Sequence, residues 1–302
     1  MLSFSAKTKN ELCRAGLGNA CCQTAELYGM LLFGTAFSNR EIRFVTAQSA
    51  VMRRIVTLFK RVCSIEVQPA LQGKRRVLQI TEPACIALVM DKLGYDFKSY
   101  ITYHLNRNLV DNECCVPAFL RGIFLAAGSI ASPEKKCHLE IKIGHVILGR
   151  EVMSLLLDAN MTPKMAERRT SWLLYWKGAG QIEDFLTMIG AHHAAMSLME
   201  AKVEKQLRNE VNRAVNCETA NIMKVTSTST RQIAAIERAL ASGGLEIFPE
   251  NLRETVDLRV ANPTASLSEL AAMFEPPISK PGLSHRLGRI MEIAAHVTKD
   301  AE

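Results

Sequence analysis

The 302-residue chain is long enough for two domains, and its composition of 48% hydrophobic and 22% charged residues excludes a disordered protein. No run reaches the roughly 18 apolar residues of a membrane span, and the first residues lack the apolar core of a signal peptide. We therefore expect a cytoplasmic protein without a membrane partner.

The positive charge is unevenly distributed along the chain. The formal net charge is +7; residues 1–217 hold 28 Lys and Arg against 19 Asp and Glu, whereas residues 218–302 hold 9 against 11. A basic surplus in the N-terminal part is compatible with a polyanionic partner such as DNA, although many proteins of similar charge bind none.

Nine cysteines raise the question of disulfides or a metal site. Their number is odd and no secretory signal precedes them, so we expect reduced, mostly buried thiols. Adjacent pairs such as Cys21-Cys22 lack the two-residue spacing that lets two thiolates bind one zinc ion. We therefore expect no bound metal. The chain also lacks a glycine-rich phosphate loop, and we expect no cofactor.

The first predicted element is a helix over "CCQTAELYGMLLFGTAF", which begins at Cys21. A strand at "EIRFVTA" and an amphipathic helix from Ser49 to Val62 follow. Two short strands at "SIEVQP" and "RRVLQIT" and a helix from Glu82 to Leu93 complete the segment. The predicted order is helix, two strands, helix, two strands, helix.

The same order recurs about 93 residues later. "CCVPAFLRGIFLAAGSI", from Cys114 to Ile130, aligns with the first helix, and "HLEIKIG", a helix from Arg150 to Ala159 and the aromatic strand "TSWLLYWKG" follow. This offset also places the pair Arg75-Arg76 on the pair Arg168-Arg169. The chain is therefore predicted to contain two copies of one unit.

Gly29 and Gly122 occupy equivalent positions in the repeated helix. Glycine costs a helix on the order of 1 kcal/mol relative to alanine, so its appearance in both copies indicates that another backbone comes close there. The two copies of the helix packed face to face would supply that neighbour.

"LYGMLLFGT" and "LRGIFLAAG" resemble the signature helix of LAGLIDADG homing endonucleases, whose monomeric members join two αββαββα halves over a DNA-facing sheet. The resemblance implies an acidic residue near the end of each helix, where carboxylates hold catalytic Mg²⁺. The aligned positions here are Gly34 and Ala127, which cannot ligate the ion through a side chain. We therefore expect the scaffold without its catalytic residues.

The C-terminal segment has a different character. We place the first repeat at 1–110, the second at 111–215, a linker at 216–230 and a helical domain at 231–302. The Ser/Thr-rich start of "VTSTSTRQIAAIERALASGG" offers caps for a helix that ends at the Gly-Gly pair, and a second helix is predicted in "PENLRETVDLRVANP".

Residues 266–295 have the pattern of a helix-turn-helix. Ser266 or Ser268 can cap a short helix, and Ser279 a longer one. No acidic residue occurs from Pro276 to Met291. In such a recognition helix, Ser and Lys contact phosphate and Arg or His reaches base edges, although a solvated basic face would look similar. The candidates are Ser284, His285, Arg286 and Arg289 for bases, and Ser279 and Lys280 for phosphate.

A degenerate LAGLIDADG pair followed by a helix-turn-helix resembles the WhiA family of sporulation and cell-division regulators. The resemblance implies an α+β fold, binding to double-stranded promoter DNA, a nucleoid-associated location and roles in division, chromosome segregation and sporulation, without enzyme activity. On the inherited sheet, Arg75, Arg76, Arg168 and Arg169 would hold phosphates or contact a protein partner. Two other functions stay open, namely a divergent Mg²⁺-dependent endonuclease and a protein-interaction scaffold.

Overall fold

The computed structural model describes residues 2–95, 103–134, 137–168 and 171–299. The chain divides into two compact units, residues 1–205 and 206–302. The first unit combines helices and sheets and the second is helical, which confirms the predicted fold class. Within the described residues, no helix is both long and apolar enough to cross a membrane.

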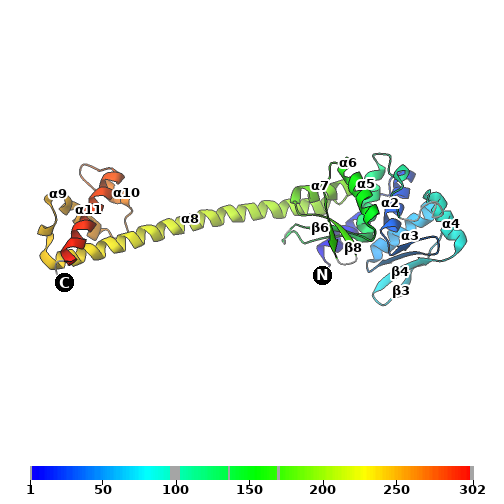
Figure 1. Ribbon diagram of the computed structural model, residues 1–302, viewed down its shortest axis with the longest axis horizontal. Helices are drawn as coiled ribbons and strands as arrows, with labels where there is room; N and C mark the ends of the chain where they lie inside the picture. Colours follow the sequence, from blue (N-terminus) through cyan, green and yellow to red (C-terminus); the bar gives the residue numbers. More distant parts are fainter. Residues whose placement is uncertain (1, 96–102, 135–136, 169–170, 300–302) are drawn as a thin grey trace. The chain divides into compact units, whose positions relative to one another are not determined.

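The first unit contains the predicted duplication (Figure 1). After α1 (Phe4–Leu12), the first repeat comprises α2 (Ala20–Leu32), β1 (Ala36–Phe37), β2 (Ile42–Thr46), α3 (Ser49–Cys63), β3 (Ala70–Gln72), β4 (Arg75–Ile80) and α4 (Pro83–Lys92). A 3-10 helix (Arg107–Leu109) leads to the second repeat, which comprises α5 (Cys115–Ala127), β5 (Gly128–Ile130), β6 (Leu139–Ile143), α6 (Val146–Asp158), β7 (Lys164–Arg168), β8 (Ser171–Trp176) and α7 (Ala179–Ile189). Both repeats therefore have the order αββαββα.

Each repeat contains a four-stranded antiparallel sheet. The strand orders are β1-β2-β4-β3 and β5-β6-β8-β7, so the two sheets have the same topology. Phe44 lies opposite Leu78 in the first sheet, and Ile141 lies opposite Leu174 in the second. These four side chains are buried, because α3 packs on one face of the first sheet and α6 on one face of the second.

The predicted strand at residues 64–69 is wrong, since the strand lies later, at β3. Ser64 ends α3 in the left-handed conformation (φ 58°), and Ile65 and Val67 then pack partly buried against the core. The register of the following hairpin is set by its turn, where Gly73 has φ 60° and Gln72 pairs with Arg75.

The sequence alignment of the two Arg-Arg pairs differs from the structural equivalence of the repeats. Arg75 begins β4, whereas Arg168 ends β7. Arg168 pairs with Ser171 across the β7–β8 hairpin, as Gln72 pairs with Arg75 across the β3–β4 hairpin. Arg75 therefore corresponds to Ser171, and Arg75 and Arg168 lie on opposite sides of equivalent turns.

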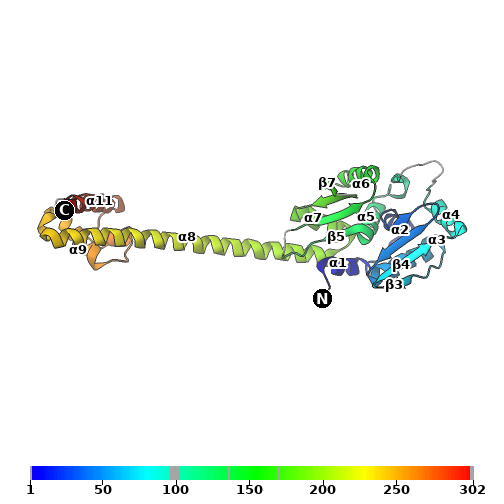
Figure 2. The same cartoon turned by 60° about the horizontal axis from the view of Figure 1, so that its bottom comes forward.

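Helices α2 and α5 lie side by side at the centre of the first unit, between the two sheets (Figures 1 and 2). A Cβ atom added to Gly29 would overlap the carbonyl oxygen of Phe119, and one added to Gly122 would overlap the carbonyl oxygen of Glu26. The two glycines thus allow the two backbones to approach each other from both sides. The predicted close contact between the two copies of the helix is confirmed.

The close contact between α2 and α5 predicts how a methyl group added at Gly122 changes the stability of the protein. Gly122→Ala should lower the free energy of unfolding by about 1–3 kcal/mol, because the added methyl group meets backbone atoms that cannot rotate away. Gly180→Ala is the matched control, since Gly180 lies in α7 with nothing within 4 Å of its added Cβ. Urea titrations of both variants check the prediction, and equal midpoints would contradict it.

A buried charged cluster joins three helices of the first unit. Glu26 of α2 is fully buried and forms ion pairs with Arg54 of α3 and with Arg121 of α5. Arg54 Nη2 donates to Glu26 Oε2 at 2.8 Å, and Arg121 Nε donates to the same oxygen at 3.1 Å. Arg54 Nη1 also donates to the carbonyl of Ala15 at 2.7 Å, and Arg121 Nη1 to that of Ile189 at 3.1 Å. The cluster therefore ties both repeats and the segment after α1 together.

Helix α8 (His192–Gly243) begins in the first unit and continues into the second. Glu11 of α1 accepts hydrogen bonds from the backbone N–H groups of His193 and Ala194 at 2.7 and 3.1 Å, and so caps the start of α8.

Residues 216–230 are helical, which corrects the expectation that a separate helix begins at the Ser/Thr run. The helix continues through this run because no Gly or Pro interrupts α8 before Gly243. The Ser/Thr side chains also need no cap position, since Thr230 Oγ1 donates a hydrogen bond to the Thr226 carbonyl within the helix at 2.9 Å. The domain boundaries drawn from the sequence stay a prediction.

The second unit has its own core. After α8 and a 3-10 helix (Leu245–Ile247) come α9 (Glu250–Ala261), α10 (Leu267–Ala272) and α11 (Lys280–Lys299). Apolar side chains from all four α-helices form one buried cluster that includes Ile236, Leu252, Leu270 and Leu287.

Candidate nucleic-acid interface

The helix-turn-helix is formed by α10, residues 273–279 and α11. Ser266 caps α10 in a reciprocal capping box, where the Glu269 N–H donates to Ser266 Oγ at 3.3 Å and the Ser266 N–H donates to Glu269 Oε2 at 2.8 Å. The hydrogen bond from the Ser266 backbone N–H, followed by a contribution from the Ser266 side chain, holds the pKa of the Glu269 carboxyl below its usual value. Ser279 Oγ accepts from the Gly282 N–H at 3.2 Å at the start of α11. Of the two predicted caps for α10, Ser266 serves and Ser268 lies inside the helix.

The connection between α9 and α10 is fixed by a buried arginine. Arg259 is 2% exposed, and its Nη1 donates to the carbonyls of Asn262 and Ala265 at 3.2 and 2.9 Å. Burial lowers the pKa of this guanidinium from its ordinary value. Ser229 of α8 donates to the Pro263 carbonyl in the same connection. The start of the short helix is therefore held by this connection as well as by its capping box.

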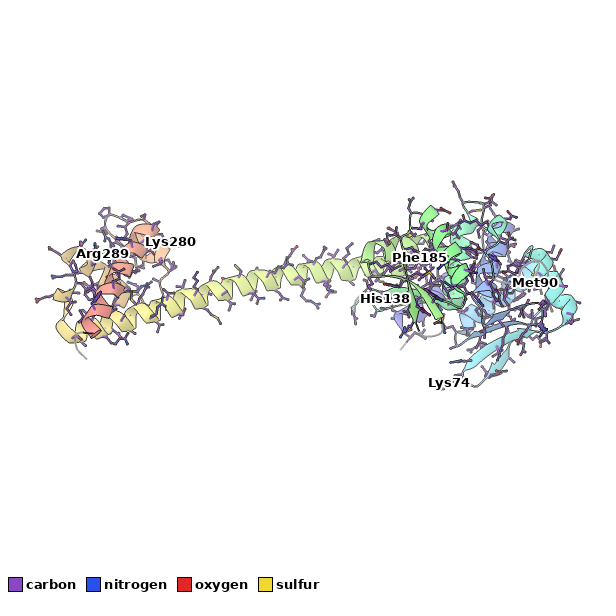
Figure 3. All side chains as sticks on the ribbon, viewed as in Figure 1. Lys74, Met90, His138, Phe185, Lys280 and Arg289 are labelled. Atoms are coloured by element: carbon purple, nitrogen blue, oxygen red, sulfur yellow. The ribbon has the colours of Figure 1, made fainter. Side chains whose placement is uncertain are left out.

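The first half of α11 presents polar side chains to solvent. Leu283, Leu287 and Ile290 recur at helical spacing and are buried on one side of the helix. The exposed candidates are Ser279, Lys280, Ser284, His285 and Arg289. Figure 3 labels Lys280 and Arg289 among them. The structure thus brings five of the six predicted DNA contacts of this segment to the surface of one helix and its cap.

Arg286 differs from the other candidates. Its side chain is half-buried, and its guanidinium carbon lies 5.4 Å from the ring centre of Phe274, a buried residue at the end of α10. This cation–π contact fixes the side chain at the edge of the helix. Arg286 therefore has a structural partner as well as a position from which it can contact DNA.

The basic residues predicted on the sheets do not all lie on the same face. Successive side chains of a strand point to opposite faces, so Arg75 and Arg76 diverge. Arg75 lines an open hollow of about 460 Å³ on the face away from α3, while Arg76 Nη1 donates to the Ala47 carbonyl at 3.0 Å. Arg168 ends β7 in the exposed position that pairs with Ser171, and Arg169 lies outside the described residues. Of the Arg75-Arg76 pair, the open face receives only Arg75.

Two further basic residues on the open faces escaped the sequence analysis. Arg43 of β2 lines the same hollow as Arg75, and its Nε is buried with no hydrogen-bond partner among the described residues. Lys142 of β6 is exposed. Both alternate with buried residues along their strands, and this period-two pattern was the signal that could have identified them.

The two positions that the sequence analysis aligned with the acidic residues of the signature helices line one cavity. Gly34 and Ala127 both line a hollow of about 510 Å³ between the C-terminal ends of α2 and α5. The remaining lining residues include Val45 and Lys142, and no Asp or Glu is found among the described residues that line this hollow. In place of carboxylates that would attract a divalent cation, the hollow carries a lysine.

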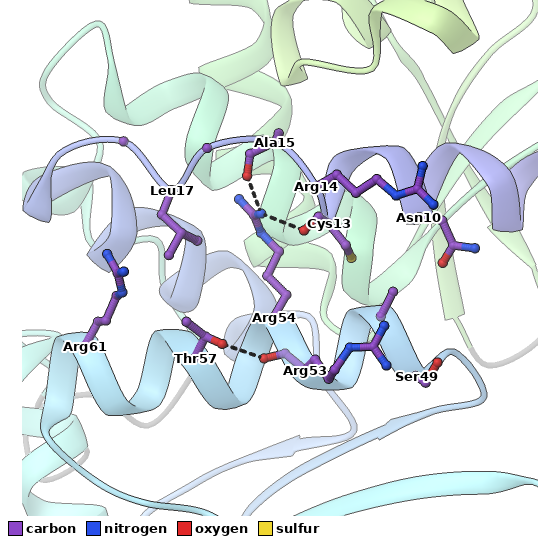
Figure 4. A pocket seen from close by; sticks show the side chains of 13 residues that line it. Asn10, Cys13, Arg14, Ala15, Leu17, Ser49, Arg53, Arg54, Thr57 and Arg61 are labelled. Atoms are coloured by element: carbon purple, nitrogen blue, oxygen red, sulfur yellow. Dashed lines mark hydrogen bonds between the residues drawn. The ribbon is translucent and has the colours of Figure 1, made fainter.

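A second basic region lies on the helical side of the first repeat. A cavity of about 560 Å³ between α1 and α3 is lined by Arg14, Arg53, Arg54 and Arg61 (Figure 4). Arg54 Nη1 donates to the carbonyls of Cys13 and Ala15, and Arg14, Arg53 and Arg61 line the same cavity. The positive charge of the first unit is therefore shared between the sheet face and this cavity.

Comparisons with known proteins agree with this architecture. The family models described as "WhiA LAGLIDADG-like domain" and "WhiA C-terminal HTH domain" match residues 116–208 and 211–294. The chain is 38% identical to the "Probable cell division protein WhiA" of Ruminiclostridium cellulolyticum over 99% of both chains. It is 36% identical to the protein of that name from Alkaliphilus metalliredigens, covering 97% of this chain and 98% of the relative.

One solved structure is similar over nearly the whole chain. The crystal structure of full-length DUF199/WhiA from Thermatoga maritima matches with a TM-score of 0.59 and 27% sequence identity. The match covers 98% of this chain and 99% of the other. The two repeats, the helix-turn-helix and the full-length similarity together show that this chain belongs to the WhiA family.

Proposed function

We propose that this protein is a sequence-specific regulator of transcription that binds double-stranded promoter DNA and acts in cell division. The relatives reported above are named probable cell division proteins, which supports the second part of the proposal. Chromosome segregation, sporulation and association with the nucleoid belong to the same proposal through the family resemblance. The proposal also includes a protein partner that binds the first unit.

The observation that carries the proposal is the surface of α11. Its first half lacks acidic residues, its cap and exposed face carry Lys280, His285 and Arg289, and its apolar face is anchored in the core of the second unit. A helix held in this way can enter the major groove, where an Arg side chain distinguishes guanine by two hydrogen bonds.

The proposal includes the absence of nuclease activity. The hollow where the signature helices end contains Gly34 and Ala127 at the former acid positions and Lys142 beside them. We expect supercoiled plasmid to stay intact in the presence of the protein and Mg²⁺. Nicking that disappears when one particular Asp or Glu is replaced would instead support the endonuclease.

The binding proposal is tested with the full chain. Duplexes selected from a random pool should share a sequence motif, and fluorescence anisotropy should show that affinity for the selected duplex falls steeply as salt increases, because phosphate contacts release counterions. Selection without a shared motif, or affinity that barely changes with salt, would favour a protein-interaction scaffold.

Arg75 and Arg76 provide a matched pair for the sheet. Arg75→Ala should reduce the slope of log affinity against log salt by about 1, because one phosphate contact is lost, and should leave the sequence preference unchanged. Arg76→Ala should leave the slope as it is, since this side chain is bound to the Ala47 carbonyl on the other face. Anisotropy across a salt series measures both slopes. Equal slopes for the two variants would show that the open face of this sheet does not contact DNA.

A further inference from the structure

The two pairs of adjacent cysteines meet in space. Cys21 and Cys22 lie in the first turn of α2, Cys114 caps α5 and Cys115 is its first residue. The four Sγ atoms all lie within 4.8 Å of one another. Helices α2 and α5 both begin at this cluster and both end at the hollow of Gly34 and Ala127, so the cluster and the former active site occupy opposite ends of the helix pair.

The distances between the sulfur atoms fit one small ion. The Sγ atoms of Cys21 and Cys114 are 3.8 Å apart, and those of Cys114 and Cys115 are 3.9 Å apart. A tetrahedron with metal–sulfur bonds of about 2.3 Å has edges of about 3.8 Å, which is the geometry of a tetrathiolate zinc site. The sulfur atoms of a disulfide are closer, at about 2.05 Å. Two of the six sulfur–sulfur separations therefore match the edges of such a site, and the other four are no longer than 4.8 Å.

The helix N-termini favour negative charge on the sulfur atoms, whereas burial opposes it at Cys22 and Cys115 by raising the pKa of both thiols. Both pairs lie at helix N-termini, where backbone N–H groups and the helix dipole stabilise negative charge. Asn112 Nδ2 lies 4.0 Å from the Cys115 sulfur and can donate to it, which is the kind of contact that orients a ligand from outside the coordination shell. Cys22 and Cys115 are buried, whereas Cys21 and Cys114 are exposed, so an ion can enter from solvent.

We propose that Cys21, Cys22, Cys114 and Cys115 form a structural site for one zinc ion that joins the two repeats at the start of their signature helices. Binding exchanges thiol protons for the metal and transfers no electrons. Tetrahedral coordination by four sulfurs selects zinc among the common divalent ions. Thiolates are soft ligands that suit zinc, and zinc accepts the tetrahedral geometry because it has no geometric preference of its own. Neither pair could form this site alone, since each supplies only two ligands.

The first test is the metal content of the full chain, purified with a reductant and without a chelator. Elemental mass spectrometry should find about one zinc per chain. Replacement by Co²⁺ should give the intense visible and near-ultraviolet absorption of tetrahedral cobalt bound to thiolates. Cys21→Ser and Cys114→Ser change exposed residues and should fold, yet should lose most of the zinc and the thiolate absorption. Cys217→Ser, at an exposed cysteine of α8, is the matched control and should retain both.

A stability measurement keeps the test independent of expression. Zinc should raise the urea midpoint of the unmodified chain and leave that of Cys21→Ser unchanged, because an ion that binds the folded state stabilises it. The proposal is overturned if the reduced chain takes up neither zinc nor cobalt, or if both variants bind as much metal as Cys217→Ser. A Cys21–Cys114 disulfide in the metal-free protein under reducing conditions would also overturn it.

Discussion

Glu26→Ala is expected to lower the free energy of unfolding of the first unit by about 3–5 kcal/mol. The carboxylate is the shared partner of Arg54 and Arg121, and its removal leaves two guanidinium groups in the interior without a counter-charge. The side chain of Arg54 is 3% exposed and that of Arg121 is 12% exposed, so water cannot replace the lost ion pairs. Since total stabilities are about 5–15 kcal/mol, the variant should be close to unfolding.

The chain offers a selective signal for this measurement. Both of its tryptophans, Trp172 and Trp176, lie in β8, so the change in tryptophan fluorescence during urea unfolding reports on the first unit. Glu66→Ala is the matched control, because Glu66 forms an ion pair with Lys60 in which both side chains are more than two-thirds exposed. That pair is screened by solvent, and we expect no measurable shift of the urea midpoint.

The alternative outcome is informative. If Glu26→Ala and Glu66→Ala shift the midpoint equally, the buried cluster does not support the packing of α2, α3 and α5. An intermediate loss is expected for Glu26→Gln, which keeps the shape of the side chain and one acceptor but removes the charge.

Strong local patterns made most of the fold predictable from the sequence. The repeated helix was identifiable because its apolar run, its cysteines and its glycine recur at one offset. Gly29 and Gly122 predicted the close contact between α2 and α5. Ser266 and Ser279 marked the starts of α10 and α11 through their capping chemistry. Each of these features depends on neighbours within a few residues, or on a repeat that the sequence displays directly.

The errors concern features that tertiary pairing decides. The β3 strand was placed several residues too early, because Ile65 and Val67 are apolar for core contacts rather than for pairing. The Ser/Thr run in α8 suggested a helix start, yet such side chains can also bond to their own helix, as Thr230 does.

The cysteine cluster could not be found from spacing alone. Each pair of adjacent cysteines lacks the separation of a metal motif, and the second pair follows 93 residues later. Only the packing of α2 against α5 brings the four sulfur atoms together. The same limit applies to Arg43 and Arg75, whose common hollow depends on the pairing of β2, β3 and β4.

Arg289→Ala is expected to weaken binding of the full chain to its selected duplex by about 1–3 kcal/mol and to relax the sequence preference at one position of the site. Arg289 is exposed on the face of α11 that lies away from Leu283, Leu287 and Ile290, so its side chain can extend into a groove. Its removal should not destabilise the second unit, because no apolar contact of the core depends on it.

Arg286 gives a less selective test of base contacts. Its guanidinium rests on Phe274, so Arg286→Ala removes a contact within the unit together with any contact to DNA. Loss of affinity in that variant combines the two effects, and thermal unfolding of the free protein is needed to separate them. Arg289→Ala therefore provides the clearer result.

The control is Arg238→Ala, which removes the same charge from an exposed position of α8. Both variants are compared by anisotropy with the selected duplex and with duplexes that carry each single base-pair change. If α11 reads the bases, Arg289→Ala should bind one set of changed duplexes as well as the selected one, while Arg238→Ala keeps the full preference. If both variants lose affinity equally for every duplex, α11 contributes only charge, and sequence recognition must be sought on the open faces of the two sheets, where Arg43, Arg75 and Lys142 lie.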